Sequence, residues 1–144
     1  MEVKLAKTAG FCFGVKRAVD TVYKEAEKNS ERIYTFGPII HNEQVVEDLK
    51  KNGVFVVNTI EELKSLKSGT TVIVRSHGVG KGIYDLMEEC GLKIVDATCP
   101  FVKKIHRIAE RESKAGKRII IIGNDKHPEV EGIKGWVCGQ ATVI

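Results

Sequence analysis

Short β-branched runs alternate along the chain with stretches whose apolar residues recur at helical spacing, and this alternation most constrains the fold. Strands are predicted at residues 33–36, 54–57, 71–74 and 93–95, with helices between them. The first helix shows the pattern most clearly, at spacings of i, i+3, i+4, i+7, i+8 and i+11. Its inward residues are Val15, Ala18, Val19, Val22, Tyr23 and Ala26. Such alternation is typical of an α/β fold, with mostly parallel sheets flanked by helices.

The two ends of the chain and one long helix complete this prediction. Additional strands are expected at residues 3–5, 118–122 and 141–144. The run at 118–122 is the most continuous, as expected for a parallel strand covered on both faces. A helix from Pro100 should carry four apolar residues inward and leave His106 on its surface. These inward residues are Val102, Ile105, Ile108 and Ala109.

Individual residues mark where several of these helices begin or end. Asn42 is a suitable N-cap, and the segment from Thr59 to Glu62 has the pattern of a capping box. Gly91 suits the position just after a helix, and Pro100 suits the first position within one. The helix boundaries should therefore lie close to these residues.

Composition excludes several classes of protein. The 144 residues carry 23 Lys and Arg against 19 Asp and Glu, a net charge of +4 that is too small and scattered to indicate nucleic-acid binding. No apolar run approaches the roughly 20 residues of a transmembrane helix, so no membrane association is expected. The N-terminus lacks the apolar core of a signal peptide, which predicts a cytoplasmic protein. In that reducing compartment, four cysteines are expected to be buried, catalytic or metal-bound.

Five Cys and His residues share one kind of position, each just after a predicted strand and at or before a helix start. They are Cys12, His41, His77, Cys99 and His127. Because ligands of parallel α/β sheets bind at the carboxyl ends of the strands, these side chains are expected to face one site. Imidazoles and free helix N-terminal N–H groups suit a phosphate or diphosphate, so the histidines predict an anion site.

Each of these residues also has a structural interpretation. His41, His77 and His127, taken one at a time, are better explained as surface loop residues. Cys12 and Cys99 could be a buried small side chain and a chance helix cap, although the dipole of a helix N-terminus favours the thiolate form at Cys99. Cys90 and Cys138 are better explained as structural. Glu129 follows His127 by two residues, and the pair could move a proton, with Glu129 as donor.

Five segments together resemble the signature segments of the hydroxymethylbutenyl diphosphate reductase family, the iron–sulfur enzymes that complete the non-mevalonate route to isoprenoid precursors. They are AGFCFGV (9–15), GPIIHN (37–42), RSHGV (75–79), DATCP (96–100) and HPEV (127–130). The segments occur in the family's order and span the whole chain. That order makes the resemblance specific, although each segment alone is weak evidence.

The resemblance implies a role for each matching residue. Cys12 and Cys99 match two of three cysteines that hold a [4Fe–4S] cluster, whose open iron binds the substrate hydroxyl. The family's substrate is an allylic alcohol that carries a diphosphate, and its substrate-contacting histidines match His41, His77 and His127. Glu129 matches the acid that lets the hydroxyl leave as water. Two electrons from a flavodoxin- or ferredoxin-type donor then give isopentenyl and dimethylallyl diphosphate.

The resemblance also implies that the chain is an incomplete reductase. The family fold has three lobes around the cluster; residues 1–98 would form the first and 99–144 part of the second. The third cluster cysteine and the third lobe would lie beyond this chain, whose exposed docking surface could cause self-association. Two alternatives remain open: a non-catalytic diphosphate-binding module, and a zinc hydrolase using His41, His77 and His127, with Glu129 as base.

Overall fold

A four-stranded parallel sheet forms the centre of the computed structural model, which describes residues 2–28 and 32–144. Its strands are β1 (Ile33–Phe36), β2 (Val54–Val57), β3 (Thr71–Val74) and β4 (Lys93–Asp96). The spatial order is β2-β1-β3-β4, so β1 lies between β2 and β3. Every residue of β3 is buried, as expected for an inner strand of a parallel sheet.

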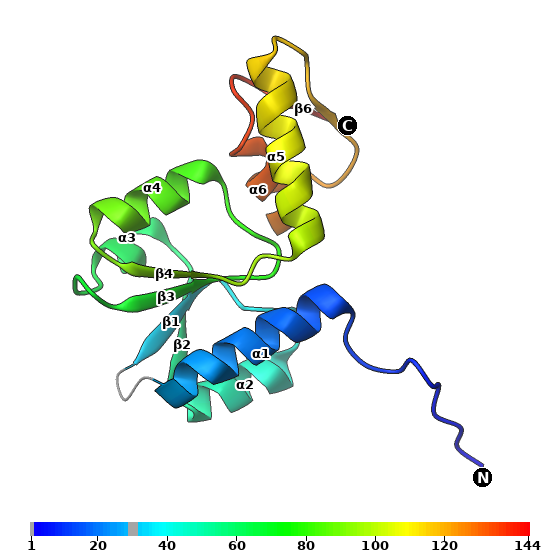
Figure 1. The fold of residues 1–144 in the computed structure, drawn as a ribbon, viewed down its shortest axis with the longest axis vertical. Helices are drawn as coiled ribbons and strands as arrows, with labels where there is room; N and C mark the ends of the chain where they lie inside the picture. Colours follow the sequence, from blue (N-terminus) through cyan, green and yellow to red (C-terminus); the bar gives the residue numbers. More distant parts are fainter. Residues whose placement is uncertain (1, 29–31) are drawn as a thin grey trace.

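Helices cover both faces of this sheet (Figure 1). The helices α1 (Phe13–Lys28) and α2 (Glu43–Lys51) lie on one face. The other face is covered by α3 (Ile60–Lys64) and α4 (Lys81–Glu89). Successive residues of β3 divide between the two cores: Ile73 packs with α1 and α2, whereas Val72 and Val74 pack with α3 and α4. This period of two confirms the predicted α/β class.

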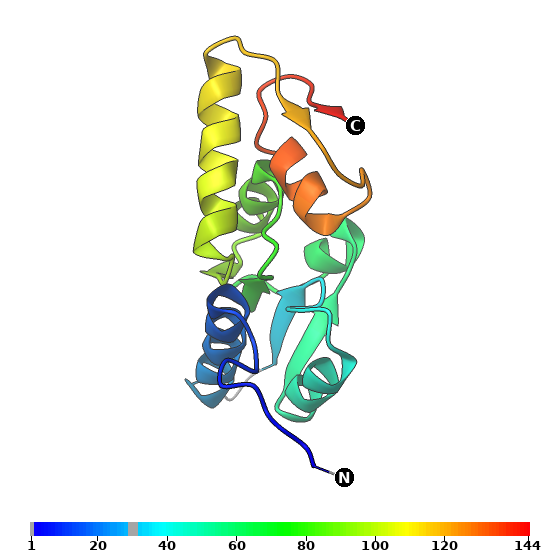
Figure 2. The same ribbon diagram turned by 90° about the vertical axis from the view of Figure 1, so that its right-hand side faces the viewer.

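A second, smaller unit lies at one end of this sheet (Figures 1 and 2). It consists of α5 (Pro100–Lys114), β5 (Ile120–Ile121), α6 (Pro128–Lys134) and β6 (Thr142–Val143). The two short strands pair in parallel, and α6 packs against α5. Among the described residues, no helix has both the length and the apolar character needed to cross a membrane.

The predicted helix-end signals are confirmed. The Asn42 side chain accepts a hydrogen bond from Val45 N–H, and Thr59 forms a complete capping box with Glu62. Pro100 opens α5, and Gly91 has a φ of +66° just after the end of α4. The left-handed conformation at Gly91 is one that glycine adopts without steric cost.

Three predictions about strands and faces are wrong. Residues 3–5 form no strand and are exposed, so Cys12 does not follow a strand. The run at 118–122 contributes only a two-residue strand, and Ile122 is 88% exposed. Alternate side chains of a strand point to opposite faces, and the described residues cover only one face of this run.

The buried face of α5 also differs from the prediction. It consists of Val102, His106, Ala109 and Ser113, at spacings of four, three and four residues. Ile105 and Ile108 instead lie on the outer side of the helix and are 42% and 40% exposed. His106 is only 3% exposed, so its assignment to the helix surface is wrong. The inner face is rotated because the ring of His106 packs into a space bounded by Gly78 and Gly132.

Candidate functional site

The loops that follow β1 and β3 meet at the point where the strand order reverses. The chain leaves β1 toward β2 on one side, whereas β3 lies on the other side of β1. Such a switch point leaves a crevice at the carboxyl ends of the two strands, where α/β proteins bind ligands. The two loops are joined by Ser76, whose buried hydroxyl and backbone N–H both donate to the carbonyl of Ile39, at 2.9 and 3.3 Å. They carry His41 and His77.

Three predicted histidines come together at this crevice. The ring centroids of His41 and His77 are 4.7 Å apart, and those of His77 and His127 are 6.0 Å apart. His127 reaches the cluster from the second unit, at the start of α6. The three residues lie far apart in the sequence, but their rings form one histidine cluster, with His77 in the middle.

The electrostatics of the cluster suit an anion. Burial, together with the positive charges of His41, Arg75 and His127, lowers the pKa of His77 to about 4. Burial also lowers the pKa of Arg75, although Glu131 opposes this effect. Among the described residues, the buried Nδ1 of His77 and Nε of Arg75 have no hydrogen-bond partner. An anion in the crevice would be attracted by these positive charges, and its oxygens would accept hydrogen bonds from the unpartnered nitrogens of His77 and Arg75.

Arg75 was not among the predicted site residues. It lies at the end of β3, two residues before His77, in the same segment, RSHGV. A cation directly after a fully buried strand is the signal that points to it, because the carboxyl end of such a strand faces the ligand crevice.

His127 and Glu129 interact through the backbone rather than through the carboxylate. The Nδ1 atom of His127 accepts a hydrogen bond from the Glu129 N–H at 3.2 Å and so caps α6. If the ring is neutral, its proton is therefore on Nε2. This bond fixes the orientation of the imidazole. The half-buried carboxyl group of Glu129 takes no part in this hydrogen bond.

Two predicted cysteines begin neighbouring helices. The carbonyl of Cys12 accepts the first α1 hydrogen bond, from Lys16 N–H, and the carbonyl of Cys99 accepts the first of α5, from Lys103 N–H. A Cβ atom added at Gly14 would overlap the Cys99 sulfur, so the first turn of α1 lies directly against this thiol. Both cysteines are free thiols, Cys12 exposed and Cys99 half-buried.

These two thiols fit part of an iron–sulfur site. Thiolates at two adjoining helix N-termini are suitable ligands for such a cluster. Cys138 does not join them, because its N–H donates to Ser113, in the last turn of α5, about 20 Å along the helix from Cys99. In the part of the chain that the structure describes, no three His, Cys, Asp or Glu side chains are arranged to hold a metal ion.

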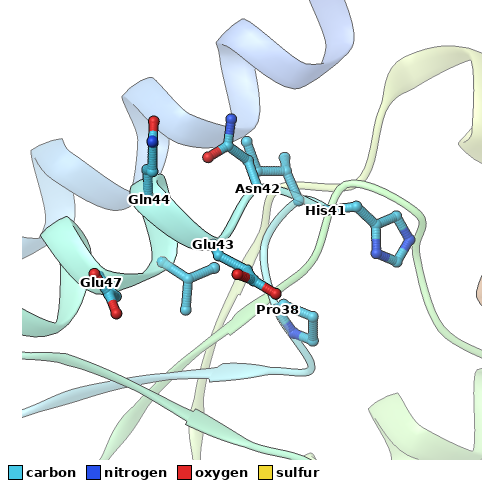
Figure 3. Close-up of a pocket in the computed structure, with 8 residues that line it drawn as sticks. Pro38, His41, Asn42, Glu43, Gln44 and Glu47 are labelled. Atoms are coloured by element: carbon cyan, nitrogen blue, oxygen red, sulfur yellow. The ribbon is translucent and has the colours of Figure 1, made fainter.

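A pocket with a volume of about 810 Å³ lies beside α2. Figure 3 shows Glu43 and Glu47 on its wall; His41 also lines the pocket, although its ring extends away from α2. Two carboxylates would repel a diphosphate. The part of the pocket beside Glu43 and Glu47 therefore suits an anionic ligand less well than the histidine cluster does.

The fold and the cluster define an α/β protein with a histidine-lined crevice at the carboxyl edge of its sheet. A family model described as LytB protein matches residues 3–144, and the chain belongs to that family. Relatives are named 4-hydroxy-3-methylbut-2-enyl diphosphate reductase. That of Caldanaerobacter subterraneus subsp. tengcongensis is 48% identical over 145 residues, which cover 100% of this chain and 50% of the relative. That of Clostridioides difficile is 47% identical, with the same two coverages.

Solved structures of these reductases share the fold. One, described as the terminal enzyme of the non-mevalonate pathway, has a TM-score of 0.82 and 40% sequence identity, and the match covers 96% of this chain and 48% of that one. The Plasmodium falciparum reductase has a TM-score of 0.89 and 30% identity, with coverages of 96% and 42%. The chain spans about half the length of the relatives it matches.

Proposed function

We propose that this chain is the part of a 4-hydroxy-3-methylbut-2-enyl diphosphate reductase that binds the substrate diphosphate and supplies two cysteine ligands to a [4Fe–4S] cluster. The observation that carries the proposal is the convergence of His41, His77 and His127 at the switch point. The buried and unpartnered Nε of Arg75 beside them supports an anionic ligand. The names of the relatives support this particular diphosphate.

The proposed reaction removes the hydroxyl group of the substrate reductively. The allylic C–O bond breaks, and the oxygen leaves as water after taking up a proton. Two electrons from a reduced flavodoxin- or ferredoxin-type carrier and a second proton convert the remaining fragment into isopentenyl or dimethylallyl diphosphate. When bound, the cluster supplies these electrons and a Lewis-acidic iron.

The side chains of this chain divide the remaining work. His41 and His77 bind the diphosphate, together with Arg75. His127, fixed by its bond from the Glu129 N–H, presents Nε2 to the substrate, and Glu129 delivers the proton. Cys12 and Cys99 hold the cluster. Residues 1–98 and 99–144 would belong to a first and a second lobe, and a further cysteine outside this chain would complete the ligand set.

Inorganic pyrophosphate is the direct probe of the anion site in this chain. We expect isothermal titration calorimetry to detect binding, and His77→Ala to weaken the affinity at least tenfold, because the central donor is lost. Gly82→Ala is the matched control, since nothing lies within 4 Å of a Cβ at that exposed position. Unchanged affinity in both His41→Ala and His77→Ala would remove the histidine cluster from the site.

The cysteine assignment is tested by anaerobic reconstitution with iron and sulfide. Iron bound by the chain should fall in Cys12→Ser and Cys99→Ser. It should not change in Cys138→Ser, because that thiol lies near the far end of α5. A colourless wild-type chain without iron would show that two thiolates are too few. Equal iron in all three variants would refute the assignment.

The proton donor is tested in a reductase that contains this segment. We expect Glu129→Gln to lower turnover by about 10²-fold or more, which is the usual contribution of a general acid. Substrate affinity should not change, because the Glu129 backbone N–H that orients His127 is retained. Turnover close to that of the wild type would exclude Glu129 as the donor.

A further inference from the structure

His106 lies beneath the histidine cluster without belonging to it. The ring is 3% exposed and packs between the loop that follows β3 and helix α6. A Cβ at Gly78, the residue after His77, would lie 2.6 Å from the ring atom Cε1. A Cβ at Gly132 would lie 3.3 Å from Nε2. Two glycines therefore let the imidazole contact both elements at once.

The same ring is held from a third direction. Trp136 stacks on His106 with ring centroids 5.6 Å apart and an interplanar angle of 19°. The Nε1 atom of Trp136 donates to the carbonyl of Val79 at 2.9 Å, which ties the end of α6 to the His77 loop. Nearby, the N–H of Lys81 donates to the carbonyl of Gly135 at 3.2 Å. His106 is therefore the side chain around which this loop and α6 are assembled.

These contacts matter because His77 and His127 belong to different units. His77 follows a strand of the four-stranded sheet, whereas His127 caps a helix of the second unit. Their ring separation of 6.0 Å depends on how closely the loop docks on α6. We propose that His106 is a positioning residue whose ring, wedged between Gly78 and Gly132, sets the spacing of His77 and His127. The consequence for diphosphate affinity rests on the proposed function; the spacing itself does not.

Nuclear magnetic resonance of the imidazole protons tests the spacing directly, because the chain has only four histidines. In the wild type we expect nuclear Overhauser contacts between the rings of His77 and His127. They should disappear in His106→Ala and return in His106→Phe, which restores a flat aromatic ring. Val54→Ala is the matched control, because it removes a buried side chain at the start of β2, at the opposite edge of the sheet.

Pyrophosphate affinity is measured on the same proteins. His106→Ala should weaken binding about tenfold, with recovery in His106→Phe and no change in Val54→Ala. If His106→Ala does not fold, His106→Leu replaces it, since it keeps bulk without a flat ring. Ring contacts that persist in the Ala or Leu variant, or that are also lost in Val54→Ala, would overturn the inference. A wild type with these contacts but no pyrophosphate binding would refute the proposed function alone.

Discussion

The buried ring of His106 gives the free energy of unfolding a pH dependence that one substitution should remove. In the unfolded chain this imidazole has its ordinary pKa of 6.5. Burial lowers the pKa to about 4 in the folded protein, although Asp96 opposes the effect. Between these values, the unfolded chain binds a proton that the folded protein does not. Stability from this group is therefore fully present above pH 6.5 and is lost as the pH falls toward 4.

The size of the effect follows from these two pKa values. At pH 5 the imidazole is almost fully protonated in the unfolded chain and almost neutral in the folded protein. The linkage relation then gives a loss of about 2 kcal/mol relative to pH 7.5. His106→Phe removes the titrating group but keeps an aromatic ring against Trp136. The variant should therefore lose about 2 kcal/mol less than the wild type between these pH values.

Urea unfolding at pH 7.5 and pH 5, followed by the circular dichroism of the helices, measures this difference. Burial and neighbouring positive charges also lower the pKa of His77 to about 4, so both proteins retain an acid-dependent loss. The informative quantity is therefore the difference between their losses. It corresponds to about 1 M in the urea midpoint, for the slopes typical of small proteins. Equal losses in the two proteins would refute the argument that burial keeps His106 neutral.

Two more substitutions, Gly14→Ala and Ser76→Ala, test the contacts that join the elements of the site, with Gly82→Ala as a comparison. Gly14→Ala should lower the free energy of unfolding by about 1–3 kcal/mol, because the new methyl group would overlap the Cys99 sulfur. Gly82→Ala, in an open part of α4, should instead raise it by about 0.5–1 kcal/mol, and thermal unfolding of both variants separates clash from helix propensity. Ser76→Ala removes a buried hydroxyl that donates to Ile39, and should cost about 1 kcal/mol and weaken pyrophosphate binding; unchanged affinity would show that this bond does not hold the crevice.

The α/β class and most element boundaries could be predicted from the sequence because local signals agree with the tertiary structure. The capping box at Thr59 begins a helix where expected, and Gly91 follows the end of one where expected. The meeting of His41 and His77 was also accessible, since residues after neighbouring parallel strands meet at one edge of the sheet. His127 belongs to the second unit, so that rule does not explain its place beside His77.

The buried face of α5 could not be predicted, because apolar periodicity assumes that imidazole is a surface group. Ile105 and Ile108 read as inward-facing residues, yet the space beneath α5 is bounded by glycines and Trp136 and accommodates the flat ring of His106. The prediction for residues 118–122 was wrong for a related reason. Its composition predicts burial, but burial depends on which elements cover the strand.

The charges around His77 favour a ligand site over a structural one. Two other partly buried cations have a polar partner: Lys103 pairs with Asp96 at 2.6 Å, and Arg17 donates to the carbonyl of Thr98 at 3.0 Å. Arg75 has no such contact among the described residues, and its charge lowers the pKa of His77 instead. Without a ligand this arrangement costs stability, because burial and neighbouring positive charges both oppose protonation. A bound anion would offset the neighbouring positive charges. Its binding should therefore raise the pKa of His77 and be accompanied by proton uptake below neutral pH. Under the proposed function, the positive charges that destabilise the free protein would thus be the source of its affinity for a diphosphate.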